Sequence, residues 1–226
     1  MVSLIYTFDD RAGQNELILK GELHKYLIKV RRHSVGDELA FRNREDIKTL
    51  HHYKILNIEP RGATLELLES KVFEVNATKE LHIAWCVIDA KSVEKVLPSL
   101  CEIGVSRISF IFCERSQKNF KVDFKRYKRI VEASMQQSGR TSKLMFDTYK
   151  NIKNFIEEFS DTMVFDFTDN ILEGDSDFKR VLIGCEGGFS KDEKELLKSQ
   201  EVFRLNTPMV LRSESAVMAV ASKILL

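Results

Sequence analysis

The chain has 226 residues, 43% of them hydrophobic, and a formal net charge of +1. This length allows one large domain or two small ones with an apolar core. We expect no membrane span, because no run of about 18 apolar residues occurs, and no secretory signal, because no basic segment precedes an apolar one at the start. Four widely spaced cysteines without a CxxC pair predict buried thiols in a reducing cytoplasm, at positions Cys86, Cys101, Cys113 and Cys185.

The net charge is close to zero, but the charged residues are unevenly distributed along the chain. Residues 115–143 contain nine basic and two acidic side chains, whereas residues 144–177 contain nine acidic and two basic ones. A second basic segment covers residues 24–33. A charged run is often only a solvated face. Two basic segments in separate regions nevertheless favour a polyanionic partner such as RNA.

Short alternating segments fill the first 70 residues. Strands are predicted over residues 17–19, 38–41, 53–58 and 63–68, with turns rich in glycine and polar residues between them. A short helix is predicted over residues 23–30. Several short strands at this spacing favour a small barrel or sandwich.

The pattern changes near residue 78, where strands begin to alternate with helices. Pro98 lies inside the predicted helix 92–103, although a proline in the middle of a helix commonly kinks or ends it. Alternation of this kind predicts an α/β fold with a parallel sheet and helices on both faces. The predicted strands are 81–87, 107–112, 163–167, 180–183 and 202–205, and the helices are 92–103, 123–137, 213–226 and one that starts at Ser190, which has capping-box spacing to Glu193.

A glycine-rich turn, Gly184-Cys185-Glu186-Gly187-Gly188, follows the predicted strand 180–183. Ligands of open parallel sheets bind beyond the carboxyl ends of the strands. The turn is neither GxGxxG nor a phosphate loop, and the acid at its centre would repel phosphates. A carboxylate suits ribose hydroxyls or a cation, and S-adenosylmethionine offers both without a phosphate. The simpler interpretation, favoured by spacing alone, is a tight turn whose glycines permit positive φ.

A second segment of interest is the start of the last predicted helix, where backbone N–H groups are free. Arg212 and Glu214 stand there, and Ser213 or Ser215 could cap the helix. A capped helix with one surface ion pair would explain the same residues.

Taken together, these segments resemble the bacterial 16S ribosomal RNA uridine N3-methyltransferase family of the SPOUT superfamily. Residues 182–190 resemble its IGPEGG(F/L)S motif, and residues 210–216 resemble its ILRTETA motif. The resemblance spans nearly the whole chain. Further matches are 102–105 to ELGV with Lys91 upstream, 114–116 to ERS, 137–140 to the end of EQSGR, and His24, Val30, Arg32, Gly36 and Asp37 to a pattern near the start.

The chain departs from the family pattern at several positions. We expect the cysteine in the glycine turn to leave that turn intact, and the changes at 136 and 209 to bear on details of RNA contact. The departures are Cys185 for proline, Gln136 for glutamate, Met209 for arginine, Arg31 for leucine, and Arg42-Asn43 for an aspartate-glycine turn.

The resemblance implies a fold that periodicity alone does not, since periodicity would predict a Rossmann-like sheet. It implies a PUA-like β-barrel that binds RNA over residues 1–72 and a SPOUT methyltransferase domain over residues 73–226. The second domain would carry a trefoil knot near the C-terminus. The family also implies a cytoplasmic homodimer with each cofactor site at the subunit interface.

The function implied is methyl transfer from S-adenosylmethionine to N3 of a specific uridine in 16S rRNA of the small ribosomal subunit. Arg212 would orient the uracil or stabilise negative charge, and Glu214 would act as a base or, somewhat better, support the helix start. No metal is expected. The cofactor-binding residues would be Phe165, Ile183, Gly184, Glu186, Gly187, Gly188, Leu205, Asn206, Leu211, Ser213 and Ala216, and the RNA-binding residues Lys25, Arg31, Arg32, Arg115 and Arg140.

Other functions stay open at this point. A SPOUT relative could methylate ribose 2′-hydroxyls of another RNA, and a non-catalytic RNA-binding assembly factor could keep the same fold. A dinucleotide-dependent oxidoreductase would need the GxGxxG motif that the chain lacks. All five histidines precede the two motifs, which leaves removal of the N3 proton to water or to the RNA.

Overall fold

The computed structural model describes residues 6–117, 120–173 and 178–226. The chain forms two compact units, one of residues 1–75 with 135–142 and the other of residues 76–134 with 143–226. The first unit thus takes in a segment from the middle of the chain, which no sequence pattern indicates. The boundary predicted between residues 72 and 73 stays a prediction. Within the described ranges, no helix combines the length and apolar character needed to cross a membrane.

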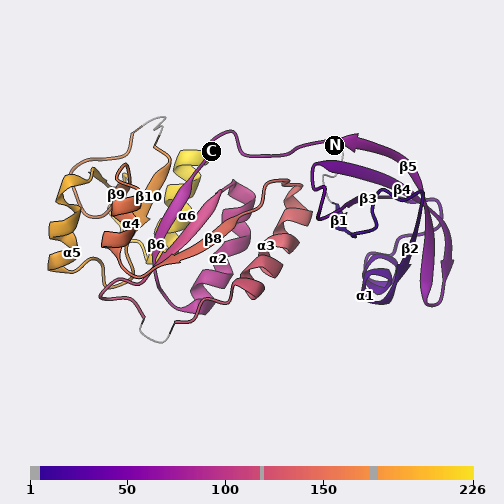
Figure 1. Cartoon of the computed structure of the whole chain (residues 1–226), viewed down its shortest axis with the longest axis horizontal. Coiled ribbons are helices and arrows are strands. Elements are labelled where there is room, and N and C mark those ends of the chain that lie inside the picture. The colour runs from indigo at the N-terminus through magenta and orange to yellow at the C-terminus, as the bar shows by residue number, and fades with distance from the viewer. Residues whose placement is uncertain (1–5, 118–119, 174–177) are drawn as a thin grey trace. The chain divides into compact units, whose positions relative to one another are not determined.

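The first unit is built on one curled sheet (Figure 1). Its strands lie in the order β1-β3-β4-β5-β2, with β1 parallel to β3 and the other pairs antiparallel. In the described residues the end strands β1 and β2 do not pair with each other, so the sheet is a half-barrel. The strands are β1 (Thr7–Phe8), β2 (Glu16–Lys20), β3 (Glu38–Arg42), β4 (Thr49–Glu59) and β5 (Gly62–Val72).

Alternation along the strands creates the core of this unit, because successive side chains of a strand point to opposite faces. Leu17, Leu19, Phe41, Tyr53 and Ile55 are all buried on the inner face. The helix predicted over residues 23–30 is present, but as a single α-turn, α1 (Gly21–His24), continued by a π-helix, η1 (Lys25–Val30).

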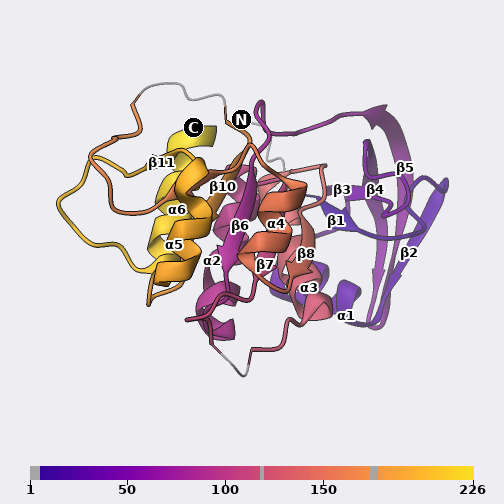
Figure 2. The same cartoon turned by 60° about the vertical axis from the view of Figure 1, so that its left-hand side comes forward.

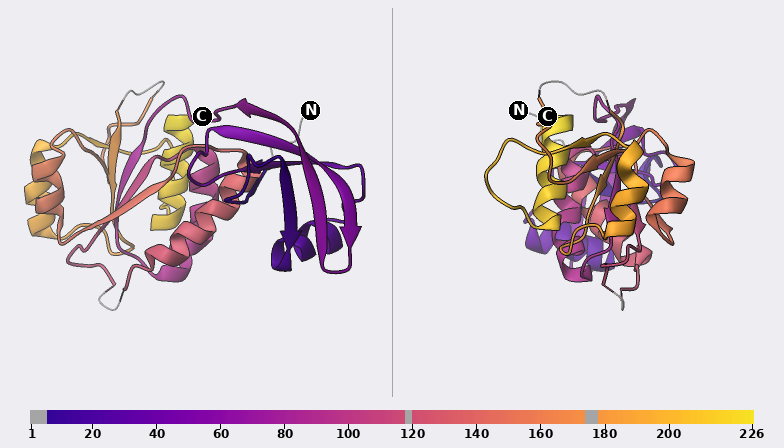
Figure 3. Two further views of the ribbon diagram at one scale, coloured as in Figure 1. Left: turned by 45° about the vertical axis from the view of Figure 1, so that its right-hand side comes forward. Right: turned by 90° about the vertical axis from the view of Figure 1, so that its left-hand side faces the viewer.

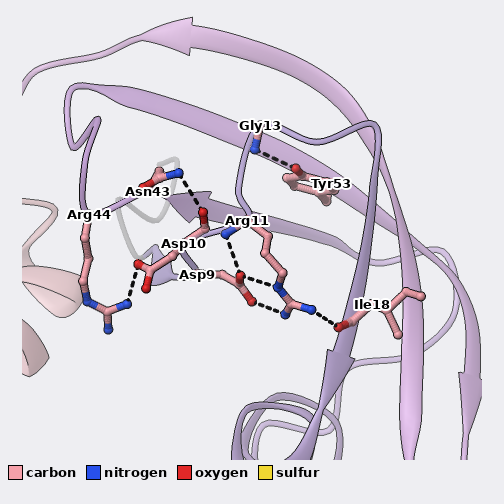
Figure 4. Close-up of polar contacts among 8 residues, drawn as sticks. All are labelled: Asp9, Asp10, Arg11, Gly13, Ile18, Asn43, Arg44 and Tyr53. Carbon is pink, nitrogen blue, oxygen red and sulfur yellow. Dashed lines mark hydrogen bonds and ion pairs between the residues drawn. The ribbon is translucent and has the colours of Figure 1, made fainter.

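A polar turn after β1 is held by side chains rather than by sheet pairing (Figure 4). Arg11 donates from Nε and Nη2 to the carboxylate of Asp9 at 2.9 and 2.6 Å, and from Nη1 to the Ile18 carbonyl at 3.0 Å. Burial raises the pKa of Asp9, but the hydrogen bonds and charge of Arg11 outweigh it, so the pKa lies below its ordinary value. Tyr53 completes the turn by accepting from the Gly13 N–H at 2.9 Å.

Arg42 is fully buried in this unit, at a position where the resembled family has an aspartate-glycine turn. Its guanidinium donates to three backbone carbonyls, of Ile47 at 2.8 Å, Lys48 at 3.0 Å and Phe73 at 2.7 Å. It also lies over the Tyr6 ring, 4.9 Å from the centroid. One side chain therefore ties the end of β3 to the segment before β4 and to the end of β5.

The second unit has a six-stranded parallel sheet in the order β11-β9-β10-β6-β7-β8 (Figure 2). Helices lie on both faces of the sheet, α4 and α5 on one and α2 and α6 on the other (Figure 3). The predicted α/β class is confirmed. The strands are β6 (His82–Cys86), β7 (Arg107–Ile111), β8 (Met145–Tyr149), β9 (Met163–Phe165), β10 (Arg180–Ile183) and β11 (Val202–Phe203); the helices are α2 (Ala90–Ile103), α3 (Phe124–Ser138), α4 (Ile152–Glu158), α5 (Lys191–Leu196) and α6 (Ser213–Leu225), with a 3-10 turn η2 (Leu197–Ser199).

Helix α2 shows how local signals set its ends. Asp89 caps it by accepting from the Ser92 N–H at 3.0 Å. The helix predicted over residues 92–103 is confirmed, and it continues through Pro98 to Ile103. Gly104 ends it with φ of +111°, and a Cβ there would lie 2.5 Å from the Cβ of Ala77. Glycine is thus required at position 104 both by conformation and by space.

Three features of the second unit differ from the sequence expectation or go beyond it. Strand β8 and helix α4 were not predicted. Cys86 and Cys113 form a disulfide across 5.8 Å between Cα atoms, so the prediction that they are thiols is wrong, whereas Cys101 and Cys185 keep their thiols. The reason is that parallel pairing of β6 with β7 brings their carboxyl ends together. The trefoil knot stays a prediction.

We predict that Arg42→Met lowers the free energy of unfolding of the first unit by about 2 kcal/mol, because three partly buried carbonyls lose hydrogen bonds from a fully buried guanidinium. Chemical denaturation followed by circular dichroism measures this loss. The fluorescence of Trp85, the chain's one tryptophan, separately reports the second unit.

Arg44→Met is the matched control, since Arg44 is exposed and pairs with Asp10 at 2.9 Å on the surface. Its cost should stay under about 1 kcal/mol. Equal stability of the two variants would contradict the structural role of Arg42.

Candidate functional site

A cavity of about 870 Å³ lies at the carboxyl ends of β9, β10 and β11, where the topology of the sheet predicts a ligand. Its volume suits a small organic molecule. The lining includes Arg212 and every predicted cofactor-binding residue except Asn206, which is exposed on the segment after β11. These are Phe165, Ile183, Gly184, Glu186, Gly187, Gly188, Leu205, Leu211, Ser213 and Ala216.

The glycine turn forms one wall of the cavity. The Gly188 N–H donates to the Cys185 carbonyl at 2.9 Å, which closes the turn as expected despite the departure from proline. Gly188 has φ of +64°, a conformation that favours glycine. Burial raises the pKa of the Cys185 thiol, so the thiol is protonated at neutral pH. Glu186 is exposed at the tip of the turn.

The predicted capping box after the glycine turn is confirmed. The Ser190 side chain accepts from the Glu193 N–H at 3.2 Å, and Glu193 Oε2 accepts from the Ser190 N–H at 2.9 Å. The other oxygen of the buried Glu193 accepts from the Glu114 N–H at 2.9 Å. One carboxylate therefore caps α5 and also fixes the segment that follows β7.

Arg115 holds the turn from the same segment. Its Nη1 donates to the carbonyl of Gly187 at 2.7 Å and to that of Phe189 at 3.3 Å. A Cβ on residue 187 would approach the Cβ of Arg115 to 3.2 Å, so the absence of a side chain at Gly187 allows this packing. Arg115 therefore stabilises the glycine turn, a structural role that was not predicted. Its predicted role as an RNA contact stays a prediction.

Ser213 connects the last helix to the floor of the cavity. Its buried hydroxyl donates to the Gly184 carbonyl at 2.6 Å and accepts from the Trp85 indole N–H at 2.8 Å. The expectation that Ser213 or Ser215 caps α6 is wrong, because the N-cap position is Arg212, without a side-chain cap. The reason is that the Ser213 hydroxyl binds the Gly184 carbonyl at the end of β10 instead of a backbone N–H of its own helix. Local sequence does not reveal this contact.

The two predicted catalytic residues occupy different environments. Arg212 is exposed and lines the cavity. Glu214 lies in the first turn of α6 and does not line it. Its Oε2 atom is buried and has no hydrogen-bond partner among the residues that the structure describes. Catalytic roles for both residues stay predictions.

Several lining residues were not predicted from the sequence. Asp166 follows β9 and forms an ion pair with Lys194 of α5 at 2.9 Å. Three large apolar side chains at the rim are strongly exposed, Phe167 at 77%, Met209 at 71% and Val210 at 76%. The predicted strand 163–167 includes Asp166, whereas β9 ends at Phe165, so the sequence pattern did not indicate that Asp166 lines the cavity. Nothing local indicates that the apolar rim is exposed.

The predicted RNA-binding residues also differ in exposure. Lys25, Arg31 and Arg32 are exposed in the first unit, whereas Arg140 is buried and donates from Nε to the Ser142 carbonyl at 2.8 Å. Lys118, one of the cations of the basic segment 115–143, lies outside the described residues. Helix α3 exposes further cations in the second unit, at Lys125, Lys128 and Arg129.

We predict that Ser213→Ala lowers the free energy of unfolding of the second unit by about 2 kcal/mol, because the Trp85 N–H and the Gly184 carbonyl both lose a buried partner. Denaturation followed by Trp85 fluorescence measures the change. The control is Ser215→Ala on the exposed side of α6, with an expected effect within about 0.5 kcal/mol. A Ser213 variant as stable as the Ser215 variant would contradict the link.

Comparison with known proteins relates this site to an enzyme family. Residues 75–225 match the RNA methyltransferase domain family. Over 221 residues the chain is 34% identical to ribosomal RNA small subunit methyltransferase E of Helicobacter pylori, covering 96% of this chain and 97% of the relative.

Solved structures are similar to both units of the fold. Ribosomal RNA small subunit methyltransferase E from Neisseria gonorrhoeae, crystallised with S-adenosyl methionine, has a TM-score of 0.76 at 16% identity, covering 96% of this chain and 95% of that one. A methyltransferase from Legionella pneumophila, solved with bound SAM, also has a TM-score of 0.76, at 20% identity, covering 96% and 94%. The chain belongs to the ribosomal RNA small subunit methyltransferase E family.

Proposed function

We propose that this protein transfers a methyl group from S-adenosylmethionine to N3 of a specific uridine in 16S rRNA of the small ribosomal subunit, in the cytoplasm. The observation that carries the proposal is the cavity at the glycine turn, with the exposed Arg212 on its wall. The names of the relatives, ribosomal RNA small subunit methyltransferase E, support the substrate class.

The cavity residues fit S-adenosylmethionine better than a phosphorylated cofactor. Apolar side chains, among them Ile183, Leu205 and Leu211, offer a surface for a flat base. Glu186 offers a carboxylate to ribose hydroxyls or to the cationic part of the cofactor. At the turn, the open space beside Gly188, where a Cβ would meet nothing within 4 Å, allows a ligand to approach the backbone closely. When bound, the cofactor supplies a methyl group activated by its positive sulfonium.

The chain must expose and orient the uracil, because N3 normally lies in a base pair and carries a proton. Enzymes that modify bases take the target out of its stack. Arg212 is well suited to bind the uracil oxygens, since its guanidinium is exposed at the cavity wall and is always charged. Negative charge develops on these oxygens as the proton leaves N3, and a fixed cation stabilises it.

Glu214 acts in this proposal mainly as support for the helix start, where a carboxylate is favoured by the helix dipole. Its buried oxygen has no hydrogen-bond partner in the described part of the chain. In this proposal, the RNA or a second subunit supplies a donor to it. A role as the base that removes the N3 proton is the alternative.

Two further proposals concern partners. Exposed cations on both units, including Lys25 and Arg32 in the first and Lys128 in the second, provide phosphate contacts that set affinity and register. The exposed apolar side chains of Phe167, Met209 and Val210 at the cavity rim form a surface suited to a second copy of the chain. A homodimer through this surface would place the subunit interface beside each cofactor site.

The experiment incubates the protein with radiolabelled S-adenosylmethionine and, separately, small ribosomal subunits, naked 16S RNA and transfer RNA. Nucleoside analysis then identifies the product. We expect N3-methyluridine from subunits, and 2′-O-methylated products would favour ribose methylation instead. A protein that binds the cofactor but labels no RNA would refute the proposed reaction.

We predict that Arg212→Ala lowers kcat of this reaction by about 100-fold or more while cofactor affinity changes little, because the charge on the uracil oxygens develops only in the transition state. Equilibrium binding of S-adenosylmethionine and steady-state kinetics on subunits separate the two effects. Lys191→Ala, another cation of the cavity lining, is the control. A kcat unchanged in Arg212→Ala would remove this residue from the mechanism.

A further inference from the structure

The end of the π-helix η1 presents an unusual group of exposed side chains in the first unit. The Arg31 N–H donates to the Tyr26 carbonyl at 2.9 Å, the five-residue spacing that defines a π-turn. Such turns are rare and occur frequently at functional sites. The wider turn ends in exposed residues on the solvent side, among them Val30 at 63%.

Arg32, the residue after this turn, is in the left-handed region, with φ of +62°. No other described residue except glycines has a positive φ. A helix commonly ends on glycine in this conformation, because a side chain there is strained. The loop that follows is fixed by Asp37, whose Oδ2 accepts from the Ser34 N–H at 2.9 Å. The chain thus keeps a cation at a position where glycine would be less strained.

Tyr26 is the exposed aromatic side chain of this group, with 42% of its surface accessible. Arg31 holds it in place, since Nε donates to the Tyr26 hydroxyl at 3.0 Å and the guanidinium lies 5.4 Å from the ring centroid. This pair depends on Arg31, which stands where the resembled family has leucine. An exposed ring that is fixed in this way loses little entropy when a flat partner binds it.

The charge of the surroundings indicates the chemistry of that partner. Residues 22–32 contain four lysine or arginine side chains, Lys25, Lys29, Arg31 and Arg32, against one acidic residue, Glu22. All of these cations are exposed. Proteins that bind single-stranded nucleic acid combine a positive surface with aromatic rings on which bases stack. Tyr26 within this group of cations has that combination.

We propose that Tyr26 is a stacking platform for an unpaired base of the RNA substrate, positioned by Arg31, while Lys25, Lys29 and Arg32 bind the phosphates on either side. This inference rests on the proposed function in taking RNA as the substrate, but it concerns binding alone. Stacking on Tyr26 requires an unstacked base, and this contact adds to the electrostatic attraction of the phosphates. The first unit would therefore prefer single-stranded RNA to a duplex.

The test measures binding of the full chain to a single-stranded oligoribonucleotide of about 10 nucleotides that carries one 2-aminopurine, over a series of salt concentrations. Stacking on Tyr26 should quench the 2-aminopurine fluorescence. We expect Tyr26→Leu to weaken binding roughly tenfold and to abolish the quenching, with an unchanged slope of log affinity against log salt. Lys29→Gln should instead reduce that slope by about 0.7, because it removes one phosphate contact.

Three further variants separate stacking from a merely structural role. Tyr26→Phe and Tyr26→Trp retain a ring and should retain the quenching, which also covers the case that Tyr26→Leu folds poorly. Arg31→Lys retains the charge but not the planar guanidinium, so it should keep the salt slope and lose part of the quenching. Phe73→Leu, at another exposed aromatic of the same unit, should change none of these quantities.

Two results would overturn the inference. One is wild-type affinity and quenching in Tyr26→Leu. The other is an altered salt slope in Tyr26→Leu without any difference in quenching. The outcome is distinguishable from failure of the proposed function, because oligonucleotide binding is measured without methyl transfer. Absent methylation with Tyr26-dependent binding would refute only the reaction.

Discussion

The hydroxyl of Ser213 is the contact on which the cavity depends. It bridges the indole N–H of Trp85, in the central strand β6, and the carbonyl of Gly184, at the end of β10. Trp85 and Ser213 are buried, and a buried donor or acceptor that loses its partner costs about 1–3 kcal/mol. The start of α6, which carries Arg212 and Glu214, is consequently fixed to the sheet at one defined point.

The other walls of the cavity are built on the same principle, in which one polar side chain from a distant segment fixes a loop. Glu193 fixes the segment after β7 while it caps α5, and Arg115 in that segment fixes the glycine turn. The disulfide between Cys86 and Cys113 joins this segment covalently to the end of β6. The groups left free to meet a ligand or a partner are those at the rim, where Arg212 and the exposed apolar side chains lie. The walls of the cavity are therefore fixed by internal contacts, whereas the side chains at its rim are exposed to a ligand or a partner.

Local sequence patterns predicted much of this fold. The elements and contacts that they did not predict each have a physical reason. The Ser190–Glu193 capping box and the buried strands have signals within a few residues. Strand β8 was missed because it is an edge strand without a fully buried side chain, and periodicity detects only a buried face. The cavity lining was predicted largely through resemblance to a family. The contacts that build it, from Ser213, Arg115 and Cys113, join residues far apart in sequence, which no local pattern can reveal.

The central claim is that the cavity floored by Gly184 and Ser213 is the cofactor site, and Trp85, which is hydrogen-bonded to Ser213, serves as its fluorescent reporter. Trp85 is the single tryptophan and is fully buried beneath this floor. A fluorescence titration with S-adenosylmethionine, run beside equilibrium dialysis of the radiolabelled cofactor, tests the claim most directly. We predict a saturable change in Trp85 emission that follows the bound fraction of the cofactor. Binding in dialysis without any change in Trp85 emission would contradict the account and place the cofactor elsewhere.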